Sequence, residues 1–411
     1  MKHVIIGVGA AGVAAAKTIR NLRPDDEIVC ISTDREVHSR CMLHHYISGG
    51  RSLESLNFAP DGLFESPRLT WLGGVTVKRI DAAAGLVHTD SGGPVSYGRL
   101  LIATGAVSAV PPVGALRTAK NVFGLRDIAD AKAIAQAASG GRRAVVVGAG
   151  FVGLDAACGL LELGGKVTVV GTADSVLPQQ LDEHAAAVYQ ARFEAHGCAF
   201  RLGAGASGTE SDPAGKVTAV LLGSGERLPC DFVVAATGVR PAVDWVRESG
   251  IEAERAVKVD EGMRTSAPDV YAAGDVTGLS GIWPNAVKQG EVAARNMCGQ
   301  SAVYDDTYAL KNTVNFYGLQ TLSVGNLAPA GNDLVLTRED NARYEKLVIR
   351  DGVVKGVLLQ GDIGNSGFWQ YLIKNKIDVS GHLDNIWRLS YTRFYGLEEN
   401  GEYRYAAAAT V

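Results

Sequence analysis

The chain has 411 residues, of which 20% are charged and 46% hydrophobic, and its formal net charge is −4. This length predicts two or three domains that each bury a core, and the small net charge excludes an obvious nucleic-acid or membrane-surface protein. No apolar run is long enough to span a bilayer, and the short run after Met1-Lys2-His3 ends at a glycine, so we expect a first strand rather than a signal peptide, and a cytoplasmic protein.

Residues 2–32 are predicted to form a strand, a helix and a second strand. The apolar run Val4-Ile5-Ile6 leads into Gly7-Val8-Gly9-Ala10-Ala11-Gly12 and an alanine-rich helical pattern. In such a turn the first glycine allows a tight bend, the second lets the backbone approach a pyrophosphate, and the third lets helix and strand pack closely. The N–H groups and dipole of the helix start then stabilise the phosphate charge.

The second strand, Ile28-Val29-Cys30-Ile31, is followed by Ser32 and Asp34. An acidic residue near this point hydrogen-bonds the adenosine ribose in the dinucleotide-binding fold. Ser32 stands where that acid is most often found, so Asp34 is the candidate ribose ligand, and a solvated turn aspartate is the alternative.

Residues 69–90 are predicted to form strands joined by turns, and Leu100-Leu101-Ile102 forms a further buried strand before the turn Ala103-Thr104-Gly105-Ala106. Pro111-Pro112 then breaks the chain and indicates a domain crossing.

A second glycine turn, Gly148-Ala149-Gly150-Phe151-Val152-Gly153, follows the strand pattern Ala144–Val147 and opens another helical pattern. Its partner strand, Lys166–Val170, ends at Gly171, and the strand Phe232–Ala235 leads into a second Ala-Thr-Gly turn at 236–238. Two such units in one chain predict two bound nucleotides, and hence electron transfer between two cofactors.

Val270–Ala273 reads as a strand that ends in Gly274-Asp275, and Trp283-Pro284 precedes a helical stretch to Cys298. From about Tyr308 the alternating runs predict an antiparallel sheet with helices. None of the six cysteines has C-x-x-C spacing, which excludes the usual iron–sulfur and zinc ligand patterns, so we predict no metal site.

These segments together resemble the pyridine nucleotide–disulfide oxidoreductase superfamily of two-dinucleotide-binding flavoproteins. The matching pieces are VIIGVGAAG, LLIATGA, VVVGAGFVGLDAA, VVAATGVRP and VYAAGDVTG with WPNAVKQG, in family order over roughly residues 1–300. Residues 38–49 and the tail segment GDIGNSG are similar to the rubredoxin reductase and nitrite reductase branch. Similar chains serve as FAD- and NAD-linked subunits in aldehyde or 2-oxoacid oxidoreductase complexes.

The resemblance implies an α/β fold with two Rossmann-like domains of the three-layer ββα kind and a C-terminal α+β domain. It assigns residues 1–110 and 241–307 to an FAD-binding domain, residues 111–240 to an NAD(P)-binding domain, and residues 308–411 to a C-terminal interface domain.

The resemblance also implies the cofactor-binding residues. For FAD they are Gly7, Gly9, Ala10, Ala11, Gly12, Asp34, Arg40, Val77, Ala103, Thr104, Gly105, Gly274, Asp275, Trp283, Pro284 and Ala286. For NAD(P) they are Gly148, Gly150, Phe151, Val152, Gly153, Gly171 and Gly238. Gly171 replaces the glutamate that NAD-specific members often carry, and no arginine follows at once to bind a 2′-phosphate. We therefore expect NAD, with NADP not excluded.

Four residues are implied in catalysis. Phe151 takes the place of a gating aromatic, and Asp155 that of a glutamate near the flavin N5 atom, with His44 or His45 as its basic partner. Cys41 aligns with the single redox cysteine of coenzyme A-disulfide reductases and NADH oxidases, but Arg40 and the tail favour the electron-carrier branch, in which Cys41 only fills space.

The implied function is an NAD(P)H:electron-carrier oxidoreductase that exchanges hydride with NAD and single electrons with an iron–sulfur or rubredoxin-type partner, either alone or as the NAD-linked subunit of a larger oxidoreductase complex. Two alternatives stay open. One is a Cys41-dependent disulfide or persulfide reductase or NADH oxidase, and the other is a non-enzymatic flavin-bearing sensor or interaction protein.

Overall fold

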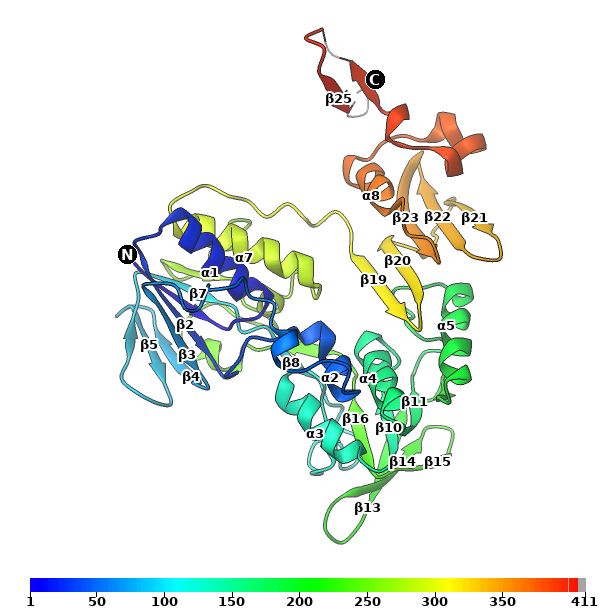
Figure 1. Cartoon of the computed structure of the whole chain (residues 1–411), viewed down its shortest axis with the longest axis horizontal. Helices are drawn as coiled ribbons and strands as arrows, with labels where there is room; N and C mark the ends of the chain where they lie inside the picture. The colour runs from blue at the N-terminus through cyan, green and yellow to red at the C-terminus, as the bar shows by residue number, and fades with distance from the viewer. Residues whose placement is uncertain (398, 406–411) are drawn as a thin grey trace. The chain divides into compact units, whose positions relative to one another are not determined.

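The computed structural model describes residues 1–397 and 399–405 and divides the chain into two compact units. The first unit comprises Met1–Asp174 and Phe193–Asp306, and the second comprises Ser175–Arg192 and the chain from Thr307 onward. Figure 1 shows the path of the chain, with the first unit in blue to yellow-green and the sheet of the second unit in yellow to orange.

The first unit contains two five-stranded parallel sheets. One has the strand order β18-β7-β1-β2-β3, formed by Val270–Ala272, Arg99–Ile102, Lys2–Ile6, Glu27–Ser32 and Leu69–Gly73. The other has the order β12-β11-β10-β16-β9, formed by Ala199–Arg201, Lys166–Val170, Arg143–Val147, Phe232–Ala235 and Val122–Phe123. In each sheet the strand before a glycine turn is the central one.

The first sheet is the middle layer of three. On one face, Ile5, Ile28 and Leu101 share a core with α1 (Ala10–Leu22) and α7 (Trp283–Met297), which lie against each other (Figure 1). On the other face, Val4 and Ile102 share a second core with the antiparallel strands β4 (Val77–Asp81), β5 (Leu86–Thr89) and β6 (Val95–Ser96). The two cores alternate along each strand, as the period-two geometry of a strand requires.

The second sheet repeats this arrangement. The helix α4 (Phe151–Glu162) follows β10 and packs on the sheet, and α3 (Ile128–Ala138) follows β9. On the other face, Val145, Val170 and Val233 pack with the antiparallel strands β13 (Ala206–Ser211), β14 (Val217–Leu222) and β15 (Arg227–Pro229). The predicted Rossmann-like units are thus confirmed.

Short elements complete the first unit. They are η1 (Arg40–Met42), α2 (Leu43–Ile47), η2 (Glu54–Leu56), the antiparallel pair β8 (Ala106–Ser108) and β17 (Val239–Pro241), α6 (Asp244–Arg247) and η3 (Asp275–Thr277). The helix α2 contacts both α3 and α4. Residues 43–47, which follow β2 of the first parallel sheet, thus lie against helices that follow strands of the second parallel sheet.

The second unit has an antiparallel sheet of order β19-β20-β23-β22-β21, formed by Lys311–Phe316, Leu319–Gly325, Val353–Gln360, Tyr344–Arg350 and Leu334–Glu339. Phe368 and Trp369 of α8 (Ser366–Asn375) pack on one face of it. The elements η4 (Ser380–Arg388), η5 (Tyr391–Arg393), β24 (Tyr395–Leu397) and β25 (Tyr403–Tyr405) follow. This confirms the antiparallel C-terminal domain.

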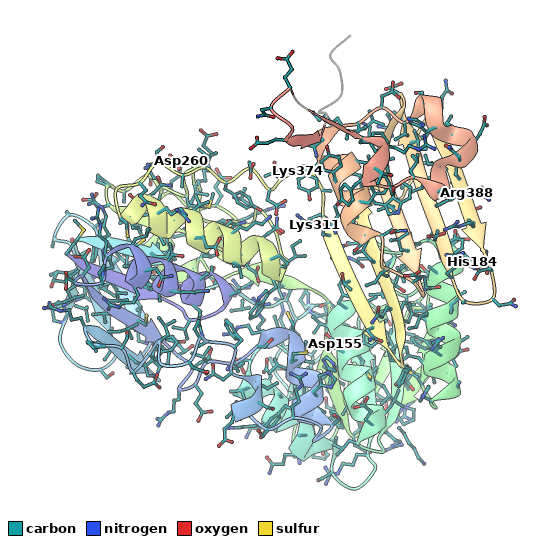
Figure 2. The ribbon with its side chains drawn as sticks, turned by 45° about the horizontal axis from the view of Figure 1, so that its top comes forward. Asp155, His184, Asp260, Lys311, Lys374 and Arg388 are labelled. Atoms are coloured by element: carbon teal, nitrogen blue, oxygen red, sulfur yellow. The ribbon has the colours of Figure 1, made fainter. Side chains whose placement is uncertain are left out.

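The chain passes between the units after Asp174, after Arg192 within α5 (Glu183–Ala195), and after Asp306. In the second unit the hydroxyl of Tyr189 donates to the Leu319 carbonyl at 2.6 Å and lies 2.8 Å from the Thr321 hydroxyl, which ties α5 to β20. His184, near the start of the same helix, is labelled in Figure 2. Across residues 1–397 and 399–405, no helix combines the length and apolar character needed to cross a membrane.

Candidate functional site

The first glycine turn forms a close-packed bend with one open position. Gly7 has a φ of +99°, and a Cβ there would overlap the carbonyl of Ala103 on the neighbouring strand connection. A Cβ at Gly12 would overlap the carbonyl of Gly7. A Cβ at Gly9, in contrast, would meet no protein atom within 4 Å. Gly7 and Gly12 are therefore required by the fold, whereas Gly9 leaves the helix start open to a ligand.

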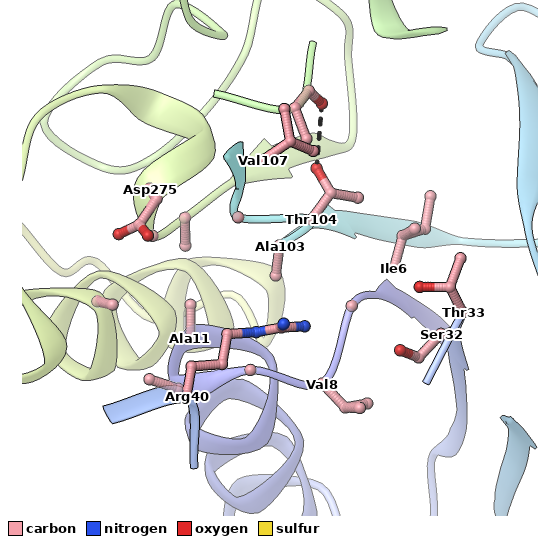
Figure 3. A pocket seen from close by; sticks show the side chains of 18 of the residues that line it. Ile6, Val8, Ala11, Ser32, Thr33, Arg40, Ala103, Thr104, Val107 and Asp275 are labelled. Carbon is pink, nitrogen blue, oxygen red and sulfur yellow. Dashed lines mark hydrogen bonds between the residues drawn. The ribbon is translucent and has the colours of Figure 1, made fainter. Parts of the chain in front are cut away.

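A cavity lies above this turn, at the carboxyl ends of β1, β2, β7 and β18, where ligands bind in open α/β sheets. Figure 3 shows this cavity and the Arg40 side chain extending into it. Most predicted FAD-binding residues line it, namely Gly7, Gly9, Ala10, Ala11, Arg40, Val77, Ala103, Thr104, Gly105, Gly274, Asp275, Trp283 and Ala286. Gly12 and Pro284 are not among the lining residues. Gly12 packs beneath the turn, and Pro284 lies in the first turn of α7, where its fixed φ suits a helix start.

Asp34 lies beside this cavity and not among its lining residues. Its carboxylate forms an ion pair with Arg40 at 2.7 Å, and both residues line an adjoining smaller cavity. At this strand end Ile31, Ser32 and Thr33 line the larger cavity, and Figure 3 labels the last two. Ser32 accepts a hydrogen bond from the Asp34 N–H at 3.1 Å. The role of Asp34 as a ribose ligand stays a prediction.

Arg126 is a lining residue that the sequence reasoning missed. Its guanidinium pairs with Asp275 at 2.6 Å and donates through Nε to the Ala106 carbonyl at 3.0 Å, while its own carbonyl accepts from Arg40 at 2.7 Å. Two arginine–aspartate pairs are thus linked at the edge of the cavity. Arg126 lies in the loop between β9 and α3, where no motif marks it.

The segment after β17 also contributes lining residues without a sequence signal. Ala242 and Trp245 line the cavity, together with Val75 and Thr76 from the turn before β4. The Thr104 hydroxyl is placed to donate to the Ala242 carbonyl at 3.4 Å, drawn as the dashed line in Figure 3. These contacts depend on the chain returning to the first sheet after residue 238, which short-range patterns do not show.

The second glycine turn has the same internal geometry as the first. Gly148 has a φ of +120°, its Cβ would overlap the Ala236 carbonyl, and a Cβ at Gly153 would overlap the Gly148 carbonyl. A Cβ at Gly150 would again meet nothing within 4 Å. The chain therefore contains two equivalent cradles for a phosphate at helix N-termini, and the residues of both fit a dinucleotide.

The remaining residues predicted for NAD(P) gather at the same sheet edge. Gly171 directly follows β11 and Gly238 follows β16 by three residues, while Phe151 and Val152 are the first two residues of α4. A Cβ at Gly171 would lie 3.0 Å from both the Ala149 Cβ and the Leu202 Cδ2.

His44 and Asp155 are brought together by the contact between α2 and α4. The His44 Nδ1 atom lies 3.5 Å from the Asp155 Oδ1 atom, and this Nδ1 is buried without a hydrogen bond. The other candidate partner, His45, lies with its ring centroid 4.0 Å from that of His44. The structure thus pairs His44 with Asp155, which lies on α4 as labelled in Figure 2.

Burial controls the protonation of this pair. It lowers the pKa of His44 to about 4, with added repulsion from His45 and Arg51, and it raises the pKa of Asp155 to about 7. At mildly acidic pH the carboxyl is therefore protonated and the imidazole is neutral.

Cys41, on η1, is exposed and lines the larger cavity. Desolvation and the nearby Asp155 raise the pKa of its thiol, with Arg126 acting in the opposite direction. A raised pKa reduces the thiolate fraction, and the thiolate is the nucleophilic form.

None of the six cysteines forms a disulfide bond, and within the described part of the chain no group of three or more His, Cys, Asp or Glu side chains is placed to hold a metal ion.

Comparison with known proteins identifies the family. Residues 1–290 match the pyridine nucleotide-disulphide oxidoreductase family, and residues 311–377 match the rubredoxin NAD+ reductase C-terminal domain. The NADH-dependent phenylglyoxylate dehydrogenase subunit epsilon of Aromatoleum evansii is 31% identical over 92% of this chain and 93% of its own length. The nitrite reductase [NAD(P)H] of Bacillus subtilis is 28% identical over 92% of this chain, which spans about half (48%) of that relative.

Among solved structures, the covalent putidaredoxin reductase–putidaredoxin complex matches with a TM-score of 0.81 and 27% identity over 93% of this chain and 95% of the other. The chain therefore belongs to the pyridine nucleotide-disulphide oxidoreductase family, whose members are FAD-dependent NAD(P)H oxidoreductases.

Proposed function

We propose that this chain is an FAD-dependent NADH:electron-carrier oxidoreductase, which exchanges hydride with NAD and single electrons with an iron–sulfur or rubredoxin-type partner protein. The observation that carries the proposal is the pair of equivalent glycine cradles, open at Gly9 and Gly150, at the carboxyl ends of two parallel sheets. Bound FAD would supply the exchange between two-electron and one-electron chemistry.

The residues take their proposed roles from their positions. Gly7–Gly12, Arg40, Arg126 and Asp275 would hold FAD at the cavity of the first sheet, and Gly148–Gly153 would hold NAD(H) at the second. We accordingly propose residues 1–110 and 241–307 as the FAD domain, residues 111–240 as the NAD domain and residues 308–411 as the interface domain.

At the start of α7, Trp283 and Ala286 line the cavity, and the Trp283 ring packs edge-on against Phe58 with centroids 4.5 Å apart. The N-terminus of a 15-residue helix carries partial positive charge, so it would stabilise negative charge on a ring system bound there. Phe151 opens α4 beside the other cradle, where a gating role would require only rotation of its side chain.

Two relatives support the proposed partner. One is named as a subunit of a phenylglyoxylate dehydrogenase, and the other was solved as a complex with putidaredoxin. We propose by analogy that this chain acts beside an iron–sulfur protein, as a subunit of a larger oxidoreductase complex.

We further propose a cytoplasmic location, because NADH is generated in the cytoplasm. Cell fractionation tests this location.

The proposal is tested by measuring electron transfer from NADH to the flavin and from the flavin to a carrier protein. The purified chain should be yellow, NADH should bleach the flavin within seconds under argon, and the reduced protein should then reduce a ferredoxin or rubredoxin. Failure of transfer in either direction, with carriers co-purified from the native host included, would sink the proposal. Slow or absent bleaching would instead favour a flavin-bearing sensor.

A second candidate is a Cys41-dependent reductase of disulfides or persulfides or an NADH oxidase, favoured by the exposure of Cys41 in the same cavity. The variant Cys41→Ser distinguishes the two. If the second candidate is correct, turnover of coenzyme A disulfide, a persulfide or oxygen falls at least a hundredfold more than transfer to an electron carrier. The raised pKa of the thiol favours the first proposal.

A further inference from the structure

Gly159 lies in the interior of α4 at the point where α2 crosses it. A Cβ at this position would stand 2.6 Å from the His44 carbonyl oxygen and 3.2 Å from its carbonyl carbon. Glycine inside a helix costs about 1 kcal/mol relative to alanine. Its presence here corresponds to a close approach of the α2 backbone that no larger residue permits.

The same helix face carries Asp155. Residues four apart on a helix are neighbours on its surface, so Asp155 and Gly159 present adjacent positions to α2. His44 contacts both, because its carbonyl rests on Gly159 and its Nδ1 lies 3.5 Å from the Asp155 carboxylate. The backbone contact at Gly159 therefore sets how near the imidazole comes to the carboxyl.

We propose that Gly159 is a positioning residue, which holds the His44 ring beside Asp155 so that the two side chains share one proton, and that this pair sets the pH dependence with which NADH reduces the bound flavin. The inference rests on the proposed function, because it places the flavin in the cavity lined by Cys41. The pair adjoins that cavity, because the lining residue Cys41 stands three residues before His44, on η1 directly ahead of α2, and Asp155 raises the pKa of the Cys41 thiol.

The pair is suited to share a proton. The His44 and Asp155 side chains are 12% and 27% exposed, and the His44 Nδ1 has no hydrogen-bond partner of its own. The imidazole nitrogen is thus left without another partner beside the Asp155 carboxyl, 3.5 Å away. If α2 moved away from α4, water would enter, and both groups would return toward their ordinary titration.

The surrounding charges act mainly on His44. On or next to α2, His45 and Arg51 oppose a positive charge on it. From α3, which also packs on α2, the titratable groups are Asp130 and Lys132, and Asp130 accepts from the Arg126 N–H at 2.8 Å. On α4 the other titratable groups are Cys158 and Glu162, and the Cys158 thiol donates a hydrogen bond to Glu162. The strands β10 and β11 beside α4 carry the charged residues Arg143 and Lys166 at their amino ends.

The variant Gly159→Ala tests the proposal with two measurements. The first is the titration of the His44 ring by NMR in the apoprotein, assigned with His44→Gln. Its midpoint should rise by one pH unit or more in Gly159→Ala. The second is the rate of flavin reduction by NADH in stopped flow between pH 5 and 9. Its midpoint should fall by at least half a unit, with the plateau rate retained within about threefold.

The matched control is Gly208→Ala on β13, where the new Cβ would stand 3.3 Å from the flexible end of Leu221 and far from the pair in sequence. This control should move neither midpoint. If Gly159→Ala does not fold, His44→Gln and Asp155→Asn take its place, because both keep Gly159 and the contact between α2 and α4. Each of these two variants must then shift the pH midpoint of flavin reduction by NADH.

Unchanged midpoints in Gly159→Ala, or in both substitute variants, would overturn the inference. A wild-type protein that NADH does not reduce at any pH would overturn the proposed function instead, while the NMR titration would still decide the role of Gly159.

Discussion

The Nδ1 atom of His44 and the Oδ1 atom of Asp155 lie 3.5 Å apart, on helices that follow different glycine turns of the chain. Burial lowers the pKa of the imidazole to about 4 and raises the pKa of the carboxyl to about 7. The folded pair therefore keeps its proton on Asp155 at pH 5–6, where the unfolded chain carries it on His44. The folded and unfolded states therefore bind the same total number of protons on this pair, but on different residues.

This exchange predicts opposite pH slopes in two variants. With Asp155→Asn, the unfolded chain binds a proton at His44 below about pH 6.5 and the folded protein does not until about pH 4, so the free energy of unfolding falls as the pH falls. With His44→Gln, the folded Asp155 keeps its proton up to about pH 7 and the unfolded one loses it near pH 4, so the free energy of unfolding falls as the pH rises.

Each slope should be at most about 1.4 kcal/mol per pH unit. Urea unfolding at pH 4.5, 5.5 and 6.5 measures each slope. Subtracting the wild-type slope isolates the contributions of His44 and Asp155, because in the wild-type protein these two contributions cancel between pH 4.5 and 6.5. Slopes of the same sign in the two variants would show that burial does not control the pair.

Gly9 and Gly12 belong to one turn but should respond differently to alanine. Because a Cβ at Gly9 meets no protein atom within 4 Å, Gly9→Ala should weaken FAD binding at least tenfold and leave the urea stability of the apoprotein within about 0.5 kcal/mol. A Cβ at Gly12 overlaps the Gly7 carbonyl, so Gly12→Ala should lower apoprotein stability by about 1–3 kcal/mol.

Flavin fluorescence titration and urea unfolding measure the two effects. Gly150→Ala, at the equivalent position of the second turn, is the control, because it should weaken NADH binding and leave FAD affinity unchanged. Equal loss of FAD in Gly9→Ala and Gly150→Ala would contradict the assignment of the two cradles.

Gly171 should control the choice between NADH and NADPH. A glutamate there would accept the ribose 2′-hydroxyl and repel a 2′-phosphate. Gly171→Glu should therefore raise the ratio of kcat/KM for NADH over NADPH at least tenfold, which is about 1.4 kcal/mol.

Gly171→Ala adds the same contacts, 3.0 Å from Ala149 and Leu202, without the charge, and separates crowding from electrostatics. If Gly171→Ala changes the ratio as much as Gly171→Glu does, the residue does not act through charge.

Arg126 should support FAD binding through Asp275. Its removal leaves the Asp275 carboxylate without its partner at 2.6 Å, at the edge of a cavity that would receive two phosphates. Arg126→Ala should weaken FAD binding at least tenfold, and Arg126→Lys should weaken it less, because it keeps the charge but loses the second donor, which bonds the Ala106 carbonyl. Arg99→Ala breaks a similar pair with Asp269, near the amino end of β7, and should leave FAD affinity unaffected. Fluorescence titration decides between these outcomes.

Local patterns in the sequence predicted the order of strands and helices and the position of both cradles. Each glycine turn is a contiguous segment in which tight bending, close backbone approach and helix packing require particular residues at particular spacings. For that reason Gly7, Gly12, Gly148 and Gly153 could be identified, along with the strands beside them and the antiparallel C-terminal sheet.

The arrangement of the charged groups required the fold. Asp34 lies at the expected strand end, yet its carboxylate pairs with Arg40, and Arg126 reaches Asp275 across 149 positions in the chain. His44 could be named only as one of two candidate partners of Asp155, and the helix crossing at Gly159 selects it. Long-range contacts of this kind follow from how helices pack on sheets, and a side chain's partner, hydration and pKa all depend on that packing rather than on its neighbours in sequence.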